Sequence, residues 1–117
     1  MLVLLAACTP ARPPPVGLDE AARELDAARN AGAATYAPLE LRNAEERLSL
    51  ARARMDKRDY STAQQLAEQS RIDSDLAAAK SRLGKAREKV ETRTRENAQL
   101  RQDLSSGSAV LPEGGQP

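Results

Sequence analysis

The scarcity of aromatic side chains constrains the fold of this chain more than any other feature of its sequence. Among 117 residues there is no Phe and no Trp, and Tyr occurs only twice. Because large aromatic side chains dominate compact cores, a thick globular core is not expected. The apolar content is mostly Ala and Leu, accompanied by many Arg and Glu, a composition typical of long helices and coiled coils.

The composition also argues against catalysis and metal binding. The chain has no His, which is the commonest metal ligand and the usual general base. Its single Cys cannot form an internal disulfide framework or a multi-cysteine zinc site. We therefore expect no enzymatic activity and no cofactor. A formal net charge of +1 argues against a dedicated nucleic-acid binder, which usually carries a strongly basic face.

The chain opens with a short apolar run that stops at its only cysteine, Cys8. The sequence Leu5-Ala6-Ala7-Cys8 resembles the bacterial lipobox, a Leu and two small residues before a cysteine that becomes acylated. This resemblance implies that residues 1–7 belong to a signal segment, that cleavage falls before Cys8, and that Cys8 carries the lipid anchor. Thr9 occupies the position directly after the cysteine, where an Asp favours retention of a lipoprotein at the inner membrane. By analogy, sorting to the outer membrane is expected.

Two features of this opening depart from a complete signal peptide. No Lys or Arg precedes Cys8, and the apolar run is shorter than the usual stretch of about 7 to 15 residues. We therefore expect the true start to lie upstream of Met1. The alternative is a short buried N-terminus whose thiol is inert. No stretch approaches the ~20 apolar residues of a membrane-spanning helix.

The segments that flank the centre of the chain are rich in residues that disfavour helices. Residues 8–17 contain four prolines, which predict a semi-rigid polyproline II tether behind the lipidated cysteine. Residues 105–117 are rich in Ser, Gly and Pro and are predicted to form a disordered tail. The domain is therefore expected to span residues 18–104.

Between residues 18 and 104, apolar residues recur at spacings of three and four, as in helices that pack along a narrow stripe. One unit, an Ala followed by Leu four residues later and by Ala three residues after that, occurs at Ala21-Leu25-Ala28, Ala44-Leu48-Ala51 and Ala79-Leu83-Ala86. Small Ala side chains at alternate positions let helix axes approach closely. We interpret all three units as packing surfaces.

Two breaks divide this region into three predicted helices. Gly32 can adopt the left-handed conformation that ends a helix, and Pro38 suits the first turn of the next one. Ala37, which precedes the proline, is disfavoured in a helical conformation. The second break spans residues 56–60, where Asp59 is the expected N-cap of a third helix that runs to about residue 104.

The far half of the third helix carries a heptad pattern. Its a positions are Leu76, Leu83, Val90, Asn97 and Leu104, and its d positions are Ala79, Ala86, Arg93 and Leu100. An Asn at an a position can specify register, whereas an Arg at a d position weakens the seam. This stripe requires another helix to pack against.

Two arrangements would supply that helix. In one, residues 18–57 run back along residues 60–104, in arms of 40 and 45 residues. In the other, the C-terminal half of the last helix associates with a second copy of the chain. We prefer the first because it needs no second chain. The predicted fold is thus all-α: an elongated antiparallel helical hairpin with a broken first arm, three helices in all, and a coiled-coil-like seam.

Residues 80–95 contain seven basic residues and only two acidic ones. This excess predicts contact with an anionic partner, or else a solvated helix face with paired charges. The second interpretation is preferred because Arg87, Glu91 and Arg95 lie four residues apart, where opposite charges pair along a helix. The segment has no aromatic side chain to stack on bases, so nucleic acid is not an expected partner.

Several motifs together indicate a family. They are Gly-Ala…Tyr-Ala-Pro within residues 31–41, the Ala44-Leu48-Ala51 unit, and Asp59-Tyr60 followed by Ala63 and Ala67. Over about residues 18–85 the chain resembles the bacterial family called domain of unknown function 4398. Members are mostly short envelope lipoproteins, some with an attached cell-wall-binding domain. The resemblance implies a helical lipoprotein of unassigned activity and supplies no catalytic residues.

The expected function is that of a lipid-anchored structural or interaction module of the bacterial cell envelope, without catalysis. Cys8 would hold it at the outer membrane, facing the periplasm, with the inner membrane as the alternative location. Besides the membrane, an envelope protein, the cell wall or a second copy of the chain are the expected partners. The alternative function is a soluble cytoplasmic coiled-coil or tetratricopeptide-like adaptor that contacts anionic partners through residues 80–95, although a tetratricopeptide solenoid needs about three repeats.

Overall fold

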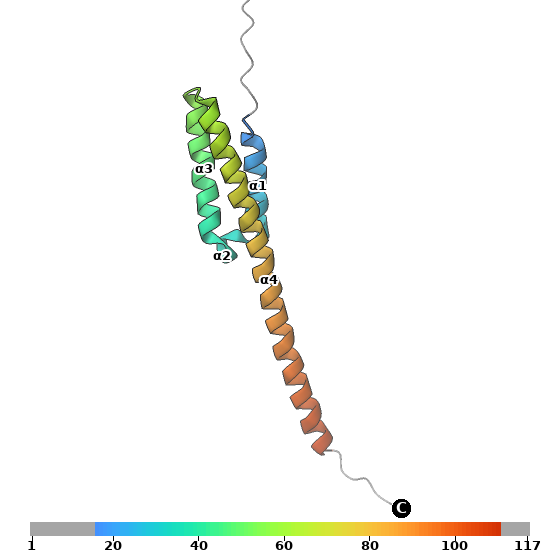
Figure 1. Ribbon diagram of the computed structural model, residues 1–117. Coiled ribbons are helices and arrows are strands. Elements are labelled where there is room, and N and C mark those ends of the chain that lie inside the picture. Colours follow the sequence, from blue (N-terminus) through green and yellow to red (C-terminus); the bar gives the residue numbers. More distant parts are fainter. Residues whose placement is uncertain (1–15, 111–117) are drawn as a thin grey trace, which may run out of the picture.

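The computed structural model describes the backbone of residues 16–110 and the side chains of residues 16–107, and all regular structure in this range is helical. The helices are α1 (Leu18–Ala31), α2 (Ala33–Tyr36), α3 (Pro38–Asp56) and α4 (Tyr60–Val110). α1 and α3 pack along the first half of α4, which continues alone as a long arm (Figure 1). The predicted all-α, elongated hairpin with a broken first arm is therefore confirmed.

The helix boundaries lie where the sequence predicts the breaks. Gly32 has a φ of 97°, and its N–H caps α1 by donating to the carbonyls of Ala28 and Arg29. Ala37 is non-helical, with φ −147° and ψ 52°, and Pro38 opens α3. The short helix α2 fills the space between these two points. These observations confirm the predicted roles of Gly32, Ala37 and Pro38.

The turn between α3 and α4 also confirms a predicted cap. The N–H of Thr62 donates to the Asp59 carboxylate at 3.3 Å, so Asp59 caps the start of α4. The preceding residue Arg58 has a φ of 60°, and α3 ends in a Schellman pair of hydrogen bonds, from Arg58 N–H to the Met55 carbonyl and from Asp59 N–H to the Arg54 carbonyl.

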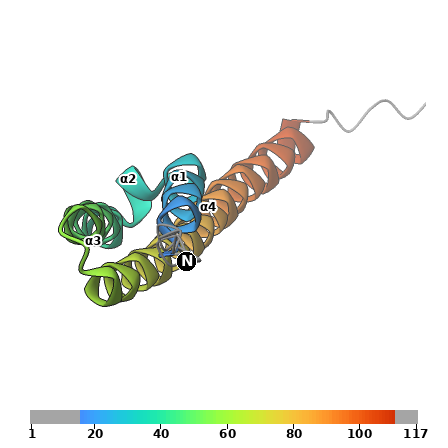
Figure 2. The ribbon, with the colours of Figure 1, turned by 90° about the horizontal axis from the view of Figure 1, so that it is seen from above.

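The first arm differs from the sequence prediction in its direction. The chain reverses at α2, so α1 runs parallel to α4 while α3 runs antiparallel to it, and the two lie on the same side of α4 (Figure 2). Gly32 lies beside Lys85, whereas Glu40, two residues into α3, is bonded to Lys80. The expected pairing of residues 18–57 with the whole of residues 60–104 is thus wrong, because the left-handed Gly32 turns the first arm back on itself.

The core is a thin layer of small side chains between α4 and the two shorter helices. Two of the three Ala-Leu-Ala units face it, since Ala21, Leu25 and Ala28 of α1 and Ala44, Leu48 and Ala51 of α3 are all buried. Ala33 and Ala37 close one end of the layer. The interpretation of these two units as packing surfaces is confirmed.

Leu66 packs half-buried against this core, but the buried side of α4 otherwise carries small residues. Along its first half they recur at spacings of four and three, and they are Ala63, Ala67, Ser70, Ser74, Ala77 and Ser81. The Ser70 hydroxyl donates to the Ala44 carbonyl of α3 at 2.7 Å, while Ser74 donates within α4 to the Ser70 carbonyl at 2.8 Å. A serine on one helix can reach the backbone of another only where the two axes are close, so small side chains set the spacing of this bundle.

α4 extends beyond the end predicted for it. It continues to Val110, past Leu104 and into the segment predicted to be a disordered tail. At about 1.5 Å per residue, its 51 residues span roughly 75 Å. Residues 111–117 and the predicted tether up to residue 15 lie outside the described residues.

A larger side chain on the small-residue side of α4 should force the helices apart. Ala67→Leu, at a position 2% exposed, is expected to lower the free energy of unfolding by about 1–3 kcal/mol through overpacking. Ala98→Leu, on the exposed arm of the same helix, is the matched control and should change it by less than about 0.5 kcal/mol. Urea unfolding followed by circular dichroism measures both variants, and equal effects would contradict close packing at Ala67.

Candidate interaction surface

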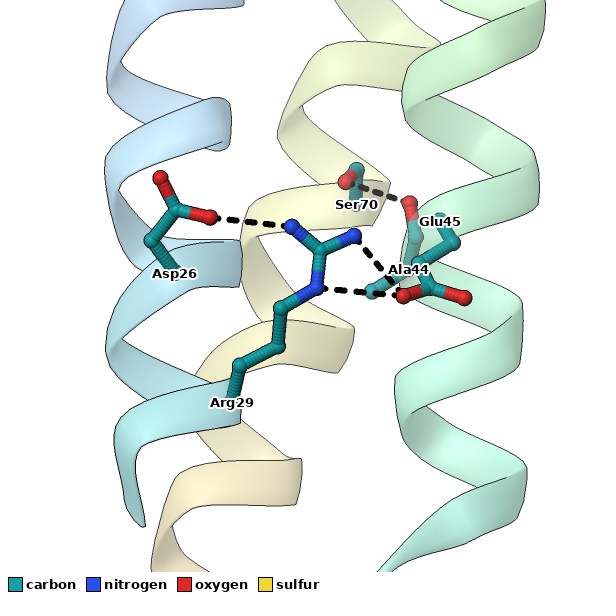
Figure 3. Close-up of polar contacts among 5 residues, drawn as sticks. All are labelled: Asp26, Arg29, Ala44, Glu45 and Ser70. Atoms are coloured by element: carbon teal, nitrogen blue, oxygen red, sulfur yellow. Dashed lines mark hydrogen bonds and ion pairs between the residues drawn. The ribbon is translucent and has the colours of Figure 1, made fainter. Parts of the chain in front are cut away.

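Ion pairs on the surface of the bundle fix how α1 sits against α3. Arg29 of α1 lies between Asp26 of its own helix and Glu45 of α3 (Figure 3). Its guanidinium donates to Asp26 at 2.9 Å and to Glu45 at 2.8 and 3.2 Å. The hydrogen bonds to Glu45 raise the pKa of Arg29, with a smaller contribution from Asp26. Since these groups are about half exposed, the contacts fix orientation more than they add stability.

A second set of polar contacts fixes the register of α3 on α4. Arg47 donates to Asp73, and Lys80 donates to Glu40. The hydrogen bond from Lys80 lowers the pKa of Glu40. Figure 3 shows the Ser70 hydroxyl aimed at the Ala44 backbone between these two contacts along α3. The buried serines escaped the sequence analysis, although their spacing of four and three with the neighbouring alanines could have revealed them.

The arm leaves the bundle at a joint built around Tyr36. The Tyr36 ring packs against Gly84 of α4, where a Cβ atom would collide with it. Its hydroxyl donates to the carboxylate of Glu88 one turn further along α4. This hydrogen bond raises the pKa of Tyr36. Tyr36 thus covers the end of the thin core and keeps its hydroxyl at the surface.

On the opposite side of α4, a stripe of large apolar residues lies exposed. We call this stripe the outer seam, and its a and d positions are Ile72, Leu76, Ala79, Leu83, Ala86, Val90, Arg93, Asn97, Leu100 and Leu104. The exposed fractions of Ile72, Leu76, Leu83, Val90 and Leu100 range from 45% to 64%. The third Ala-Leu-Ala unit, residues 79–86, belongs to this stripe. No other helix of the described chain covers it, so its interpretation as a packing surface stays a prediction.

Helix geometry explains why the outer seam is left uncovered. Successive residues of an α-helix are about 100° apart around its axis. Two residues that are two positions apart therefore point to nearly opposite sides of the helix. Leu76 follows the buried Ser74 by two positions, and Leu83 follows the buried Ser81 in the same way. Both stripes keep the same spacing of four and three, so one helix carries two parallel seams. α1 and α3 pack on the small-residue seam and do not cover the outer seam.

The basic segment 80–95 forms no single charged face. Four of its seven basic residues, Arg82, Lys85, Lys89 and Arg93, follow one another at spacings of three and four along one side of α4, whereas Lys80, Arg87 and Arg95 lie toward the other side. Lys80 is paired with Glu40, and Arg93 pairs with Glu96 at 3.2 Å. These two pairs lie on a solvated helix surface, whereas the ion pairs of the described residues do not include the expected pairing among Arg87, Glu91 and Arg95.

Other candidate features give no chemical site among the residues that the structure describes. No group of three or more His, Cys, Asp or Glu within residues 16–110 is placed to hold a metal ion. In the same range, no helix is long and apolar enough to cross a membrane. A shallow hollow between the start of α1 and α4 is lined by Val16, Gly17, Glu20 and Arg71 among others. Cys8, the predicted lipidation site, lies outside the described residues.

The bundle and its arm coincide with a known sequence family. The family model described as Domain of unknown function (DUF4398) matches residues 17–93, which include α1, α2, α3 and the first part of α4. The chain therefore belongs to this family, as its motifs indicate. No curated protein and no solved structure matches the chain significantly.

The joint at Tyr36 can be tested with two glycines of the same helix. Ala usually stabilises a helix relative to Gly by about 0.5–1 kcal/mol. At Gly107, where a Cβ meets nothing within 4 Å, Gly107→Ala should leave the thermal midpoint unchanged or raise it. Gly84→Ala should instead lower the free energy of unfolding by about 1–3 kcal/mol, because its Cβ collides with the Tyr36 ring.

A double variant identifies the cause of any loss at Gly84. Tyr36→Ala removes the ring. In that background Gly84→Ala should lower the free energy of unfolding far less than it does in the wild type, so the effects of the two substitutions should not add. Thermal unfolding of the four proteins measures this coupling. Additive effects would contradict direct contact between the ring and Gly84.

The hydrogen bond from Tyr36 to Glu88 predicts a dependence on alkaline pH. The native pKa of Tyr36 is raised above 10, so the stabilisation is complete below pH 10 and is lost as pH rises through the native value. In a Tyr60→Phe background, phenolate absorbance reports Tyr36 alone. Glu88→Gln should lower the native pKa of Tyr36, since the charged acceptor is gone. An unchanged titration would show that Glu88 does not hold this hydroxyl in solution.

Proposed function

We propose that this protein is a lipid-anchored, non-catalytic module of the bacterial cell envelope that holds an interaction arm away from the membrane. The observation that carries the proposal is the shape of α4, whose far half projects beyond the bundle with the outer seam exposed. A large exposed apolar patch commonly marks a site of interaction with another molecule. The seam has the length and spacing of a helix-pairing surface.

The anchor in this proposal is Cys8. Its support is the Leu5-Ala6-Ala7-Cys8 sequence together with membership of a family whose resemblance implies envelope lipoproteins. Each methylene of a buried acyl chain contributes about 0.8 kcal/mol, and two or more chains anchor a protein stably. With α1 following the tether, the bundle would lie nearest the membrane. We propose the outer membrane, facing the periplasm, because Thr9 follows Cys8.

The absence of catalysis rests on composition. A chain with no His and one Cys lacks the usual groups for acid–base and nucleophilic chemistry at neutral pH. The partner proposed for the arm is another helix, from an envelope protein or from a second copy of this chain. The soluble adaptor is the weaker alternative, since only four of the seven basic residues within 80–95 share one face of α4, and Glu96 lies on that face, paired with Arg93.

The anchor is tested by expressing the gene with its own upstream sequence in its native host. The wild-type protein should be found in the membrane fraction and should incorporate labelled palmitate. Cys8→Ala should lose the label and move almost wholly to the soluble fraction, because no helix of the bundle provides another anchor. Fractionation and the intact mass of the purified protein measure both effects.

A neighbouring substitution serves as the control. Thr9→Asp keeps the cysteine, so this variant should keep its label and stay membrane-bound while moving to the inner membrane. Cys8→Ala protein that remains membrane-bound to the wild-type extent would contradict the anchor. An unmodified Cys8 with residues 1–7 still attached, and binding to anionic polymers that weakens steeply with salt, would support the soluble adaptor instead.

A further inference from the structure

The outer seam has the regularity of one strand of a coiled coil. From Ile72 to Leu104 its positions alternate at spacings of four and three without interruption, which exceeds the three to four heptads expected of a coiled coil. The seam begins beside the bundle and continues along the arm. It lies nearly opposite the buried Ala and Ser residues of α4 that face α1 and α3, so a pairing helix would approach α4 from the other side. Around Val90 a shallow hollow between Ala86, Arg87 and Glu91 can receive a side chain of such a helix.

We infer that the outer seam pairs with the same seam of a second copy of this chain, in a parallel, in-register coiled-coil dimer. This inference goes beyond the proposed function because it names the partner, and it does not depend on the lipid anchor. In this arrangement Leu76, Leu83 and Val90 each meet their own equivalent across the dimer axis. The apolar surface that the fold leaves exposed becomes the core of the interface.

Asn97 argues for a second copy in parallel register. In an otherwise apolar seam, a single Asn at an a position costs stability unless it meets a polar partner, and in parallel dimers it meets the Asn of the other strand. Asn97 is exposed on the arm, and the bundle offers it no burial. An antiparallel dimer that keeps the whole seam in contact would place Asn97 against Ala79 of the partner subunit.

The flanking charges favour the same orientation. In the parallel register, a g position of one helix lies near the following e position of the other. Asp75 then lies near Lys80 of the partner subunit, and Glu96 lies near Arg101 of the partner subunit, and both pairs are favourable. Arg82 lies near an arginine, which is unfavourable. The antiparallel dimer would instead cross near residue 88. It would bring Arg82 near Glu96 of the partner subunit, which is favourable. It would also oppose Lys89 to Lys89 of the partner subunit, Arg87 to Arg87 of the partner subunit and Asp75 to Asp103 of the partner subunit, so its like-charged contacts offset that gain.

Arg93 is the weak layer of this interface. It occupies a d position, where a charge is unfavourable, but its guanidinium already donates to Glu96 on the same helix at 3.2 Å. The long aliphatic part of Arg can pack in the seam while the charged end reaches outward. One such layer lowers the affinity of the dimer without changing its register.

The dimer is tested by sedimentation equilibrium of the full chain carrying Cys8→Ser, which prevents both acylation and stray disulfides. This protein should be a dimer at micromolar to submillimolar concentration. Val90→Glu should raise the dimer dissociation constant at least ~100-fold, because two unpaired carboxylates would be buried at one layer. Thr92→Glu adds the same charge one position off the seam, at an exposed site of the same turn, and should remain dimeric.

A monomer at all concentrations, or a Val90→Glu variant as dimeric as its parent, would overturn the inference. Val90 is 64% exposed in the single chain, so its substitution does not disturb the bundle, and unchanged circular dichroism checks this. Because acylation is absent from every sample, failure here leaves the lipid anchor untouched. Conversely, loss of the anchor would leave this dimer intact.

Disulfide trapping tests the orientation. In the Cys8→Ser background, Ala79→Cys should form a covalent dimer under mild oxidation, because the parallel register brings the two Ala79 positions together. Ala98→Cys changes an alanine of the same helix that lies off the seam. It is the matched control and should not form a covalent dimer. A sedimenting dimer without a disulfide at position 79 would be antiparallel or shifted, and would overturn the in-register arrangement.

Discussion

The close approach of α4 to its two shorter neighbours is the constraint on which the rest of this structure depends. It is possible because the fully buried residues of α4 are all Ala or Ser, so that the Ser70 hydroxyl reaches the backbone of α3. Tight spacing replaces the thick aromatic core that this composition cannot build. The same small side chains contribute little apolar area each, so the bundle relies on many short-range contacts and not on a few large ones.

Polar contacts give this thin core its register. Alanine surfaces are nearly featureless and could slide past one another by a turn, whereas Arg29 with Glu45 and Lys80 with Glu40 join specific turns of different helices. At the end of the bundle, Tyr36 packs into the space that Gly84 leaves and meets Glu88. Beyond that point α4 has no further support from the shorter helices. The joint therefore marks the boundary between the part of the chain that folds on itself and the part that is offered to a partner.

The sequence predicted only part of the candidate interaction surface. The heptad pattern from Leu76 to Leu104 was evident, and so was the choice between pairing within the chain and pairing with a second copy. The preference for a hairpin within the chain is confirmed, but the prediction that its first arm covers the whole of residues 60–104 was wrong, since it assumed that the break at Gly32 and Pro38 leaves the direction of the arm unchanged. The Ala and Ser seam went unnoticed because small residues give a weak hydrophobic signal, although their spacing is as regular as that of the leucines.

By itself, the sequence determined where helices start and stop. The left-handed Gly32, the proline that opens α3 and the Asp59 cap act through backbone dihedrals and hydrogen bonds a few residues apart, so they can be read without knowing the fold. Only the tertiary structure decided which of two equally spaced seams on α4 is covered. That choice depends on the reversal at α2, which brings residues far apart in the chain to one face, and a local pattern carries no information about such contacts.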